Sequence, residues 1–161
     1  MTTYTHLDKT QKDRWLPRLF DLYHNNMNAI APSGLSYEDE RAKWFDAVSP
    51  ALDKAPRQIL LCCRDGELAG YIQYYTHSEL LMIEEVQLRA DFQRSTVFLS
   101  LARALIRMMP EEIHYVEAYA DRRNFRSIVL MQRLGMEQLT DEAGFAHFRG
   151  LAEKIQFKFL R

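Results

Sequence analysis

The spacing of the apolar side chains predicts two helices in the first third of the chain. Across residues 8–30, large apolar residues recur at intervals of three or four, which places them on one face of a helix. A segment with a proline and a glycine, residues 31–34, ends that helix. A second helix is predicted for residues 36–48, because Ser36 can cap its first turn and Asp39 follows at the position of a capping box.

Beyond residue 57 the apolar pattern changes to the short runs and alternations of β-strands, with Asp65 and Gly66 marking a type I′ hairpin. Two later amphipathic stretches predict helices at 95–109 and 123–134, the second closed by Gly135. Around these helices, strands are predicted at 58–64, 68–76, 80–88 and 113–119, with two last strands at roughly 136–148 and 154–160.

These elements follow the order ααβββαβαββ, and a short strand before residue 8 is a further option. The strand at 80–88, the helix at 95–109 and the strand at 113–119 form a βαβ crossover, so the two strands should run parallel. The hairpins at either end should be antiparallel. We therefore expect an α/β fold of the mixed α+β kind: one domain over residues 1–161, with a central mixed sheet of six or seven strands and helices on both faces.

Two segments within this order carry a family pattern. Residues 83–94 read Ile-Glu-Glu-Val-Gln-Leu-Arg-Ala-Asp-Phe-Gln-Arg, and residues 124–136 read Asn-Phe-Arg-Ser-Ile-Val-Leu-Met-Gln-Arg-Leu-Gly-Met. Together with the element order, they resemble the fourth strand, the entrance of the acyl-CoA loop and a later helix of the GNAT N-acetyltransferase superfamily. The resemblance implies a GNAT-like fold and an acyltransferase that moves an acetyl group from acetyl-CoA to a primary amine of a small molecule or peptide.

The resemblance also implies where acetyl-CoA would bind. Backbone groups of the strand, from Val86 through Gln87 to Leu88, would hold the acyl group and the pantetheine arm. A loop that leads into a helix N-terminus offers unpaired N–H groups to the pyrophosphate. In this sequence that loop consists of Gln93, Arg94, Ser95, Thr96, Val97 and Phe98.

This loop departs from the family pattern at two positions. Thr96 and Phe98 stand where the family has glycine or another small residue, which lets a ligand approach the backbone closely. Ser95 and Thr96 can instead donate hydroxyl groups to phosphate, and Arg94 adds a positive charge. Two hypotheses therefore stay open: an active acetyltransferase, and a GNAT-fold binding or regulatory module that has lost acetyl-CoA-dependent transfer.

Two adjacent glutamates are the candidates for the base that an attacking amine needs. On a regular strand Glu84 and Glu85 point to opposite faces, and Glu84 shares its face with Val86 and Leu88. A carboxylate among apolar side chains is partly desolvated and holds a proton more readily. Glu84 is therefore the first candidate, and Glu85, which could simply pair with Arg89, is the second. A structural role for both is the alternative.

Two positions of the later helix bear on the same site. Asn124 matches the family's asparagine on the pantetheine or substrate side, and it is also a good helix N-cap. Met131 stands where the family usually has a tyrosine that protonates the departing thiolate, and methionine has no proton to give. Tyr115, Tyr119 or His147 could substitute, and the sequence does not select one of them.

The overall charge and the remaining motifs argue against several other classes of protein. With 21 Lys and Arg against 22 Asp and Glu, the net charge of −1 disfavours a nucleic-acid binder, and no apolar run is long enough for a membrane span. The glycines form no G-x-G pair, and the five histidines lack metal-binding spacing, so we expect no Rossmann or Walker loop and no metal. Two adjacent cysteines and an N-terminus without a signal-peptide pattern favour a cytoplasmic protein, and the family makes a homodimer a further expectation.

Overall fold

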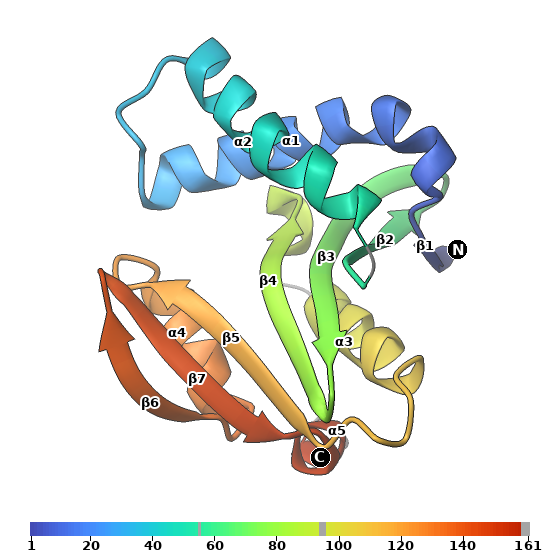
Figure 1. The fold of residues 1–161 in the computed structure, drawn as a ribbon, viewed down its shortest axis with the longest axis vertical. Helices are drawn as coiled ribbons and strands as arrows, with labels where there is room; N and C mark the ends of the chain where they lie inside the picture. Colours follow the sequence, from blue (N-terminus) through green and yellow to red (C-terminus); the bar gives the residue numbers. More distant parts are fainter. Residues whose placement is uncertain (55, 94–95, 159–161) are drawn as a thin grey trace.

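Seven strands form one mixed sheet in the computed structural model, which describes residues 1–54, 56–93 and 96–158 (Figure 1). β4 and β5 are parallel neighbours, and the other neighbouring pairs are antiparallel. In spatial order the strands are β1 (Thr2–His6), β2 (Gln58–Arg64), β3 (Glu67–His77), β4 (Leu80–Leu88), β5 (Tyr115–Asp121), β7 (Phe145–Leu151) and β6 (Glu137–Glu142). The expected α/β fold and its parallel central pair are confirmed, and β1 is the optional strand before residue 8.

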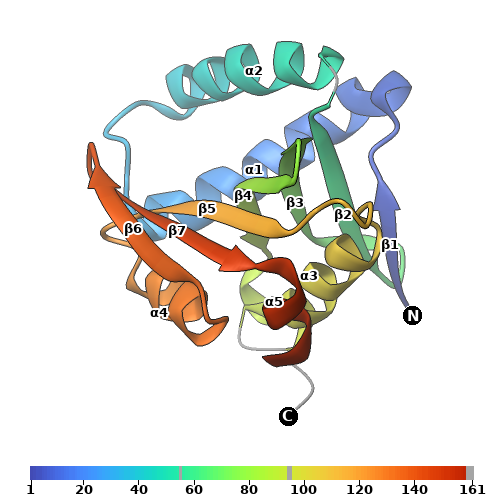
Figure 2. The same cartoon turned by 60° about the horizontal axis from the view of Figure 1, so that its bottom comes forward.

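Helices cover both faces of the sheet, as Figure 2 shows. One face, which we call the α1/α2 face, carries α1 (Lys12–Ile30) and α2 (Tyr37–Asp53), with the short 3-10 helix η1 (Lys9–Gln11) in front of α1. The opposite face, the α3 face, carries α3 (Val97–Arg107), α4 (Phe125–Arg133) and α5 (Ala152–Lys158). A second 3-10 helix, η2 (Ala90–Phe92), leads from β4 toward α3.

Each face of the sheet has its own apolar core. On the α3 face, the fully buried Leu101, Leu105 and Phe148 belong to a cluster that includes residues of β2, β3, β4, β5 and β7. On the α1/α2 face, Leu19 and Phe20 of α1 belong to a second cluster with residues of α2, β2 and β3. Each large side chain buried in this way contributes roughly 1.5–3 kcal/mol. The central strands are therefore held from both sides.

Three local structures that the sequence predicts, two helix caps and a turn, are present. Ser36 Oγ accepts a hydrogen bond from the backbone N–H of Asp39 at 3.1 Å and caps α2. Asp65 and Gly66 adopt φ angles of 52° and 86°, which the type I′ turn between β2 and β3 requires. Gly135, with a φ of 79°, follows α4 in the left-handed conformation expected of a helix cap. α2, however, continues through Pro50 and extends beyond its predicted end.

The C-terminal hairpin was predicted as a single strand, and this was wrong. Residues 136–148 contain a turn between β6 and β7, at which Ala143 and Gly144 have φ angles of 46° and 87°. Alanine followed by glycine lacks the asparagine or aspartate that usually marks such a turn. The sequence therefore gave too weak a signal to divide the segment.

The strand predicted at 154–160 is also wrong. α5 occupies Ala152–Lys158, and its residues Ala152 and Ile155, three positions apart, are both buried. Residues 159 and 160 lie outside the described residues. A segment this short contains too few apolar residues for their spacing to distinguish a helix from a strand.

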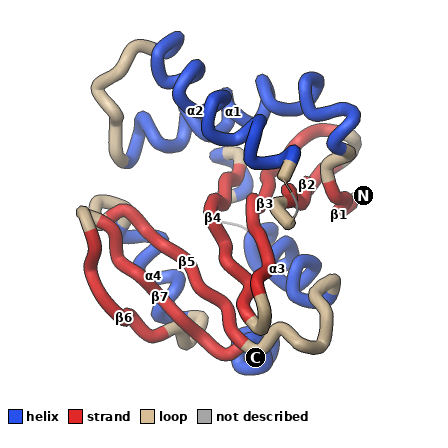
Figure 3. Tube along the Cα trace, in the orientation of Figure 1, coloured by secondary structure: helices blue, strands red, loops and turns tan. Residues whose placement is uncertain are grey.

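The parallel pairing between β4 and β5 is short. The ladder begins at Leu80 and Tyr115 and ends at Ile83 and Ala118, after which the two strands diverge in a V (Figure 1). β4 continues along β3, and β5 continues along β7. Figure 3 shows the same divergence of the two strands along the chain trace. We call the point where the ladder ends the β4/β5 split.

Candidate active site

A β-bulge lies at the β4/β5 split. Gln73 of β3 pairs with Glu85 of β4, but the next residue of β3, Tyr74, pairs with Ile83. Glu84 is therefore the extra residue of a bulge, and a bulge interrupts the regular alternation of side chains along a strand.

The bulge brings both glutamates to the α1/α2 face. Gln73 and its ladder partner Glu85 lie on that face, and Gln73 Nε2 donates to Glu84 Oε2 at 3.1 Å. Val86 and Leu88 instead pack with the core of the α3 face. The expectation that Glu84 and Glu85 point to opposite faces, with Glu84 beside Val86 and Leu88, is wrong, because the extra residue resets the alternation.

Glu84 is held in an ion pair. Arg57, just before β2, donates from Nε to Glu84 Oε2 at 2.5 Å and from Nη2 to Oε1. The guanidinium also lies over the ring of Tyr75, 5.2 Å from its centroid. Both carboxylate oxygens of Glu84 face a cation in this charge-assisted, two-point contact. Proton transfer to Glu84 would therefore have to disrupt the ion pair.

Glu85 has a different environment, formed by residues of α2 and β3. Its Oε1 accepts a hydrogen bond from the hydroxyl of Tyr71, and its Oε2 accepts one from the indole N–H of Trp44 at 3.4 Å. Both donors are buried, so the carboxylate is enclosed although part of the residue's surface stays accessible. Burial raises the pKa of Glu85 to about 7, outweighing the two hydrogen bonds, which lower it. A carboxyl group with this pKa can exchange protons at neutral pH.

Arg89 does not pair with Glu85, contrary to the structural alternative considered from the sequence. It donates to Asp91 at 2.8 and 2.9 Å and to Glu67 at 3.1 Å. These contacts lie beyond the end of β4, at an exposed edge. Glu85 is thus enclosed by neutral donors instead of a cation.

Backbone amides line the inner edge of β4 beyond the split. The N–H of Arg89 bonds to the carbonyl of Ala69, a residue of β3, at 2.9 Å. Because the bonding direction alternates from residue to residue along an antiparallel ladder, the amides of Val86 and Leu88 point away from β3. The carbonyl of Leu88 has the same direction, since it accepts from a side chain of α1 at 2.8 Å. The amides of Val86 and Leu88 therefore face the V between β4 and β5.

We call the loop at residues 93–98, which is predicted to hold the pyrophosphate, the phosphate loop. The structure describes part of it. Thr96 precedes α3 and is exposed, and its side chain makes no cap hydrogen bond. Val97 is buried in the core of the α3 face, and Phe98 packs against that core partly buried. Arg94 and Ser95 lie outside the described residues. Phe98, which stands where the family has a small residue, thus contributes to the packing of α3.

The later helix places Asn124 and Met131 in structural roles. Asn124 Oδ1 accepts from the backbone N–H of Ser127 at 3.2 Å, so the N-cap interpretation is confirmed. Met131 is 7% exposed and belongs to the core of the α3 face. Its thioether fills space there and offers no proton.

The other side of the split carries a stacked pair of rings. Tyr119 directly follows the last β5 residue that pairs with β4, and its ring stacks on His147 of β7 at 4.3 Å, with planes 8° apart. Neighbouring residues of β5, such as Ala118, are buried in the α3-face core. The Tyr119–His147 pair therefore lies on the α1/α2 face, as both glutamates of β4 do.

Charged groups hold this stacked pair in place. His147 Nε2 lies 2.9 Å from Glu117 Oε2, and Arg149 Nε lies 3.3 Å from Glu117 Oε1. Arg149 also covers the ring of Tyr115 at 4.2 Å. Three residues that could substitute for the family's tyrosine thus lie on the paired strands β5 and β7: Tyr115, Tyr119 and His147.

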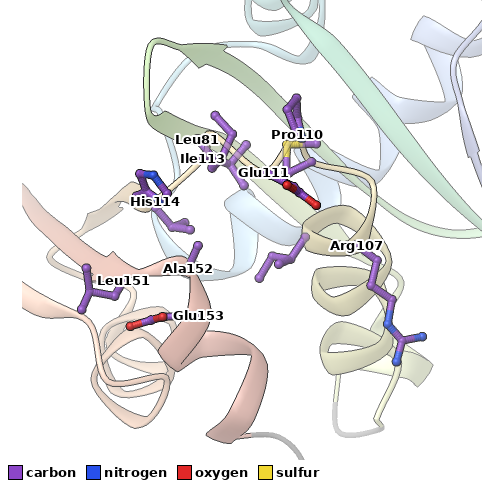
Figure 4. A pocket seen from close by; sticks show the side chains of 12 residues that line it. Leu81, Arg107, Pro110, Glu111, Ile113, His114, Leu151, Ala152 and Glu153 are labelled. Atoms are coloured by element: carbon purple, nitrogen blue, oxygen red, sulfur yellow. The ribbon is translucent and has the colours of Figure 1, made fainter.

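A cavity of about 590 Å³ lies away from this site (Figure 4). Its lining includes Leu81, Arg107, His114 and Glu153, so it opens near the starts of β4 and β5, at the opposite end from the split. Within the described ranges, no three His, Cys, Asp or Glu side chains gather as a metal site would need. No helix in the described part of the chain has the length and apolar character needed to cross a membrane.

Comparison with known proteins places these features in a family. Residues 16–136, more than half of the chain, match the profile of the acetyltransferase (GNAT) family, and the chain therefore belongs to this family. No curated protein matched the sequence.

Three solved structures show how far the fold is shared. The PaiA N-acetyltransferase of Thermoplasma acidophilum, in complex with coenzyme A, aligns with a TM-score of 0.75 at 12% identity, over 94% of this chain and 99% of its own. An acetyltransferase of Thermus thermophilus gives 0.74 at 15% identity, over 94% and 97%. The aminoglycoside acetyltransferase AAC(6')-Ib, also in complex with coenzyme A, gives 0.68 at 15% identity, over 97% and 98%. At such identities the likeness concerns the fold.

The sequence pattern marks both glutamates but not the residues that define their surroundings. These residues come from three separate parts of the chain: α2 (Trp44), the segment before β2 (Arg57) and β3 (Tyr71). They reach β4 only in the folded chain. The sequence carried one usable signal, the adjacent pair of glutamates in an apolar strand. The partners of the pair had no local pattern to mark them.

Proposed function

We propose that this protein is an acetyltransferase that moves an acetyl group from acetyl-CoA to a primary amine. The observation that supports this most is the β4/β5 split, where β4 turns the amides of Val86 and Leu88 away from β3 in a member of the GNAT family. Coenzyme A is present in two of the similar structures, those of PaiA and AAC(6')-Ib.

The backbone of β4 fits an extended, amide-containing ligand. Val86, Gln87 and Leu88 would hold the acyl group and the pantetheine arm, whose amides can pair with this edge as a neighbouring strand would. Gln93 and Thr96, which precede α3, belong to the loop that would hold the pyrophosphate, with N–H groups at the helix N-terminus supplying the donors.

The chemistry requires one bond to form and one to break. The amine nitrogen bonds to the acetyl carbon, the bond between that carbon and the CoA sulfur breaks, and the amine loses a proton. An N–H on the inner edge of β4, such as that of Val86, stabilises the negative charge that develops on the acetyl oxygen. A thiol has a pKa near ~8.5, so the sulfur can leave without the acid that Met131 cannot supply.

Glu85 is the proton acceptor in this proposal, and Glu84 the residue that the ion pair immobilises. Both oxygens of Glu84 face Arg57, whereas the partners of Glu85 are the neutral Tyr71 and Trp44. The enclosed carboxylate of Glu85 accepts the amine proton directly or through a water molecule. The order of the two candidates from the sequence is thereby reversed.

Ligand binding tests the first half of the proposal. Thermal unfolding is followed with acetyl-CoA, with CoA, and with adenosine 3′,5′-bisphosphate, which lacks the pantetheine arm. At about 100 times its Kd, a ligand adds about 2.7 kcal/mol, a shift of several degrees for a domain of this size. Acetyl-CoA and CoA should both give this shift, and the bisphosphate a smaller one. No shift with millimolar acetyl-CoA would contradict the proposal and favour a binding module without acetyl transfer.

An acceptor screen tests the second half. Release of free CoA thiol is measured with acetyl-CoA and a panel of primary amines, each beside its N,N-dimethyl analogue. The primary amines that act as acceptors should release thiol and gain an acetyl group by mass spectrometry, whereas the tertiary analogues should do neither. Thiol release that is equal for both members of each pair would indicate hydrolysis and contradict transfer to an amine.

A further inference from the structure

Four hydrogen bonds connect α1, the end of β4 and Gln93. Asn26 Nδ2 donates to Gln87 Oε1 at 2.9 Å and to the carbonyl of Leu88 at 2.8 Å. Gln93 Nε2 donates to the same carbonyl at 3.1 Å and to Asn26 Oδ1 at 3.0 Å. Asn26, Leu88 and Gln93 thus close a ring of hydrogen bonds, which we call the Asn26 ring.

The chemistry of the groups fixes the orientation of both side-chain amides. A backbone carbonyl only accepts hydrogen bonds, so Asn26 and Gln93 must each turn a nitrogen toward Leu88. The oxygen of Asn26 then receives the second N–H of Gln93. Gln87 is 6% exposed, so its Oε1 depends on a protein donor, and Asn26 supplies one.

The Asn26 ring lies between the two segments that hold acetyl-CoA in the proposed function. Leu88 ends the amide edge of β4, and Gln93 begins the phosphate loop. Asn26 ties both to α1, a helix of 19 residues whose Leu19 and Phe20 are fully buried. A loop fixed to a packed helix loses less conformational freedom when a ligand binds.

The same side of α1 also reaches the candidate base. Tyr23 lies one helical turn before Asn26 and is therefore on the same face of the helix. Burial and the nearby Glu85 carboxylate raise the pKa of the Tyr23 hydroxyl. One face of α1 thus carries Tyr23, whose hydroxyl is affected by the charge of Glu85, and Asn26, which contacts the start of the phosphate loop.

We propose that Asn26 is a positioning residue for acetyl-CoA, acting through Leu88 and Gln93 without touching the ligand. The proposal rests on the proposed function, since it concerns the same binding site. It assigns a role in binding the acyl donor to a residue of α1, outside both segments of the family pattern.

The test measures the Kd of CoA by calorimetry for the full-length protein and its Asn26→Ala variant. The substitution removes one donor each from Leu88 and Gln87 and one acceptor from Gln93, and we expect the Kd to rise about tenfold. Asn28→Ala is the matched control, because Asn28 is an exposed asparagine on the same helix. It should bind CoA like the wild type.

A double-mutant cycle separates positioning from a general loss of stability. If Asn26 acts through Gln93, the variant with both Asn26→Ala and Gln93→Ala should bind CoA about as weakly as the weaker single variant. Each variant is also melted without ligand, and only variants folded at the assay temperature are compared. With an acceptor amine, the KM for acetyl-CoA should rise in Asn26→Ala, while kcat at saturating acetyl-CoA stays near that of the wild type.

The possible outcomes distinguish this inference from the proposed function. Equal Kd values for the wild type and Asn26→Ala would overturn the positioning role and leave the proposed function intact. Fully additive losses in the cycle would show that Asn26 does not act through Gln93. If the wild type itself fails to bind CoA, the proposed function fails, and the role of Asn26 fails with it.

Discussion

Beyond the split, β4 and β5 have opposite surroundings. β4 is enclosed: α2 covers Glu85 through Trp44, and α1 reaches the end of the strand through Asn26. β5 stays paired with β7 and presents Tyr119, which is 43% exposed. One strand therefore offers backbone amides and an enclosed carboxylate, and the other offers an accessible tyrosine ring. Two strands of a parallel pair acquire different chemistry once their ladder ends.

The carboxylates along the split also differ from one another in their partners. Glu117 on β5 lies beside the cation Arg149, as Glu84 on β4 lies beside Arg57. Glu85 instead has neutral donors and a raised pKa. The same residue type thus has different properties because the packing of α2 against β4, and not the local sequence, decides which partners it meets.

The largest expected effect comes from the substitution Glu85→Gln. It keeps the size of the side chain and removes its ability to accept a proton, so kcat with an acceptor amine should fall about a thousandfold. The Kd of CoA should stay unchanged. Glu84→Gln is the matched control and should lower kcat much less. Equal kcat values for Glu85→Gln and the wild type would remove Glu85 from the mechanism.

A second prediction concerns the pH dependence of stability. The pKa of Glu85 rises from 4.5 to about 7 on folding, so this group favours the folded state most below pH 4.5. As the pH rises through about 7, on the order of 3 kcal/mol of its contribution to the free energy of unfolding is lost. Urea unfolding from pH 5 to pH 8 should show this loss in the wild type. In Glu85→Gln it should be absent, leaving that variant more stable than the wild type at pH 8. Parallel curves for the two proteins would contradict the prediction.

The close contact between β3 and β4 gives a third prediction. A Cβ atom at Gly70 would lie 2.5 Å from the backbone oxygen of Gln87 and would also collide with Leu88. Gly70→Ala should therefore displace the end of β4, lower the free energy of unfolding by about 1–3 kcal/mol, and weaken CoA binding. In the matched variant Gly150→Ala, the nearest atom is the flexible Met136 side chain at 3.0 Å, so the loss should be smaller. The denaturant midpoints of both variants are compared with that of the wild type. Equal losses of stability in the two variants would contradict the prediction.

The smallest effect is expected at Arg57. Its ion pair with Glu84 is partly exposed, with side-chain exposures of 33% and 21%, and such pairs contribute up to about 1 kcal/mol. Arg57→Gln should lower the free energy of unfolding by no more than this amount, and added salt should reduce the difference from the wild type. Lys12→Gln, which removes the ion pair with Asp53, is the control. A loss several times larger for Arg57→Gln would show that Glu84 is costly to leave unpaired.

Local patterns predicted most of the fold. Ser36 and the Asp65–Gly66 turn act through neighbours in the sequence, and the parallel pair follows from a general rule on crossovers. α5 was missed because its short segment lacks a distinctive apolar period.

The candidate site was predictable only in outline. The sequence placed both glutamates on the correct strand, but the bulge at Glu84 depends on how β3 and β4 align, and no single residue indicates it. The partners of the two glutamates come from α2, β3 and the segment before β2. Contacts between residues so far apart in the sequence form only when the chain packs. The spacing of residues along the chain therefore does not predict them.

The short ladder between β4 and β5 has a mechanical consequence. Among the described residues, backbone pairing across the middle of the sheet is confined to the four pairs from Leu80–Tyr115 to Ile83–Ala118. On either side, β1–β4 and β5–β7–β6 are antiparallel units, and the β2–β3, β3–β4 and β5–β7 ladders are longer, with seven, eight and seven pairs. The sheet thus consists of two antiparallel parts joined by a short parallel ladder, and the core of the α3 face packs against both parts. A change in the angle of the V would therefore disturb the least backbone pairing at this ladder, because both parts of the sheet could keep their own pairing.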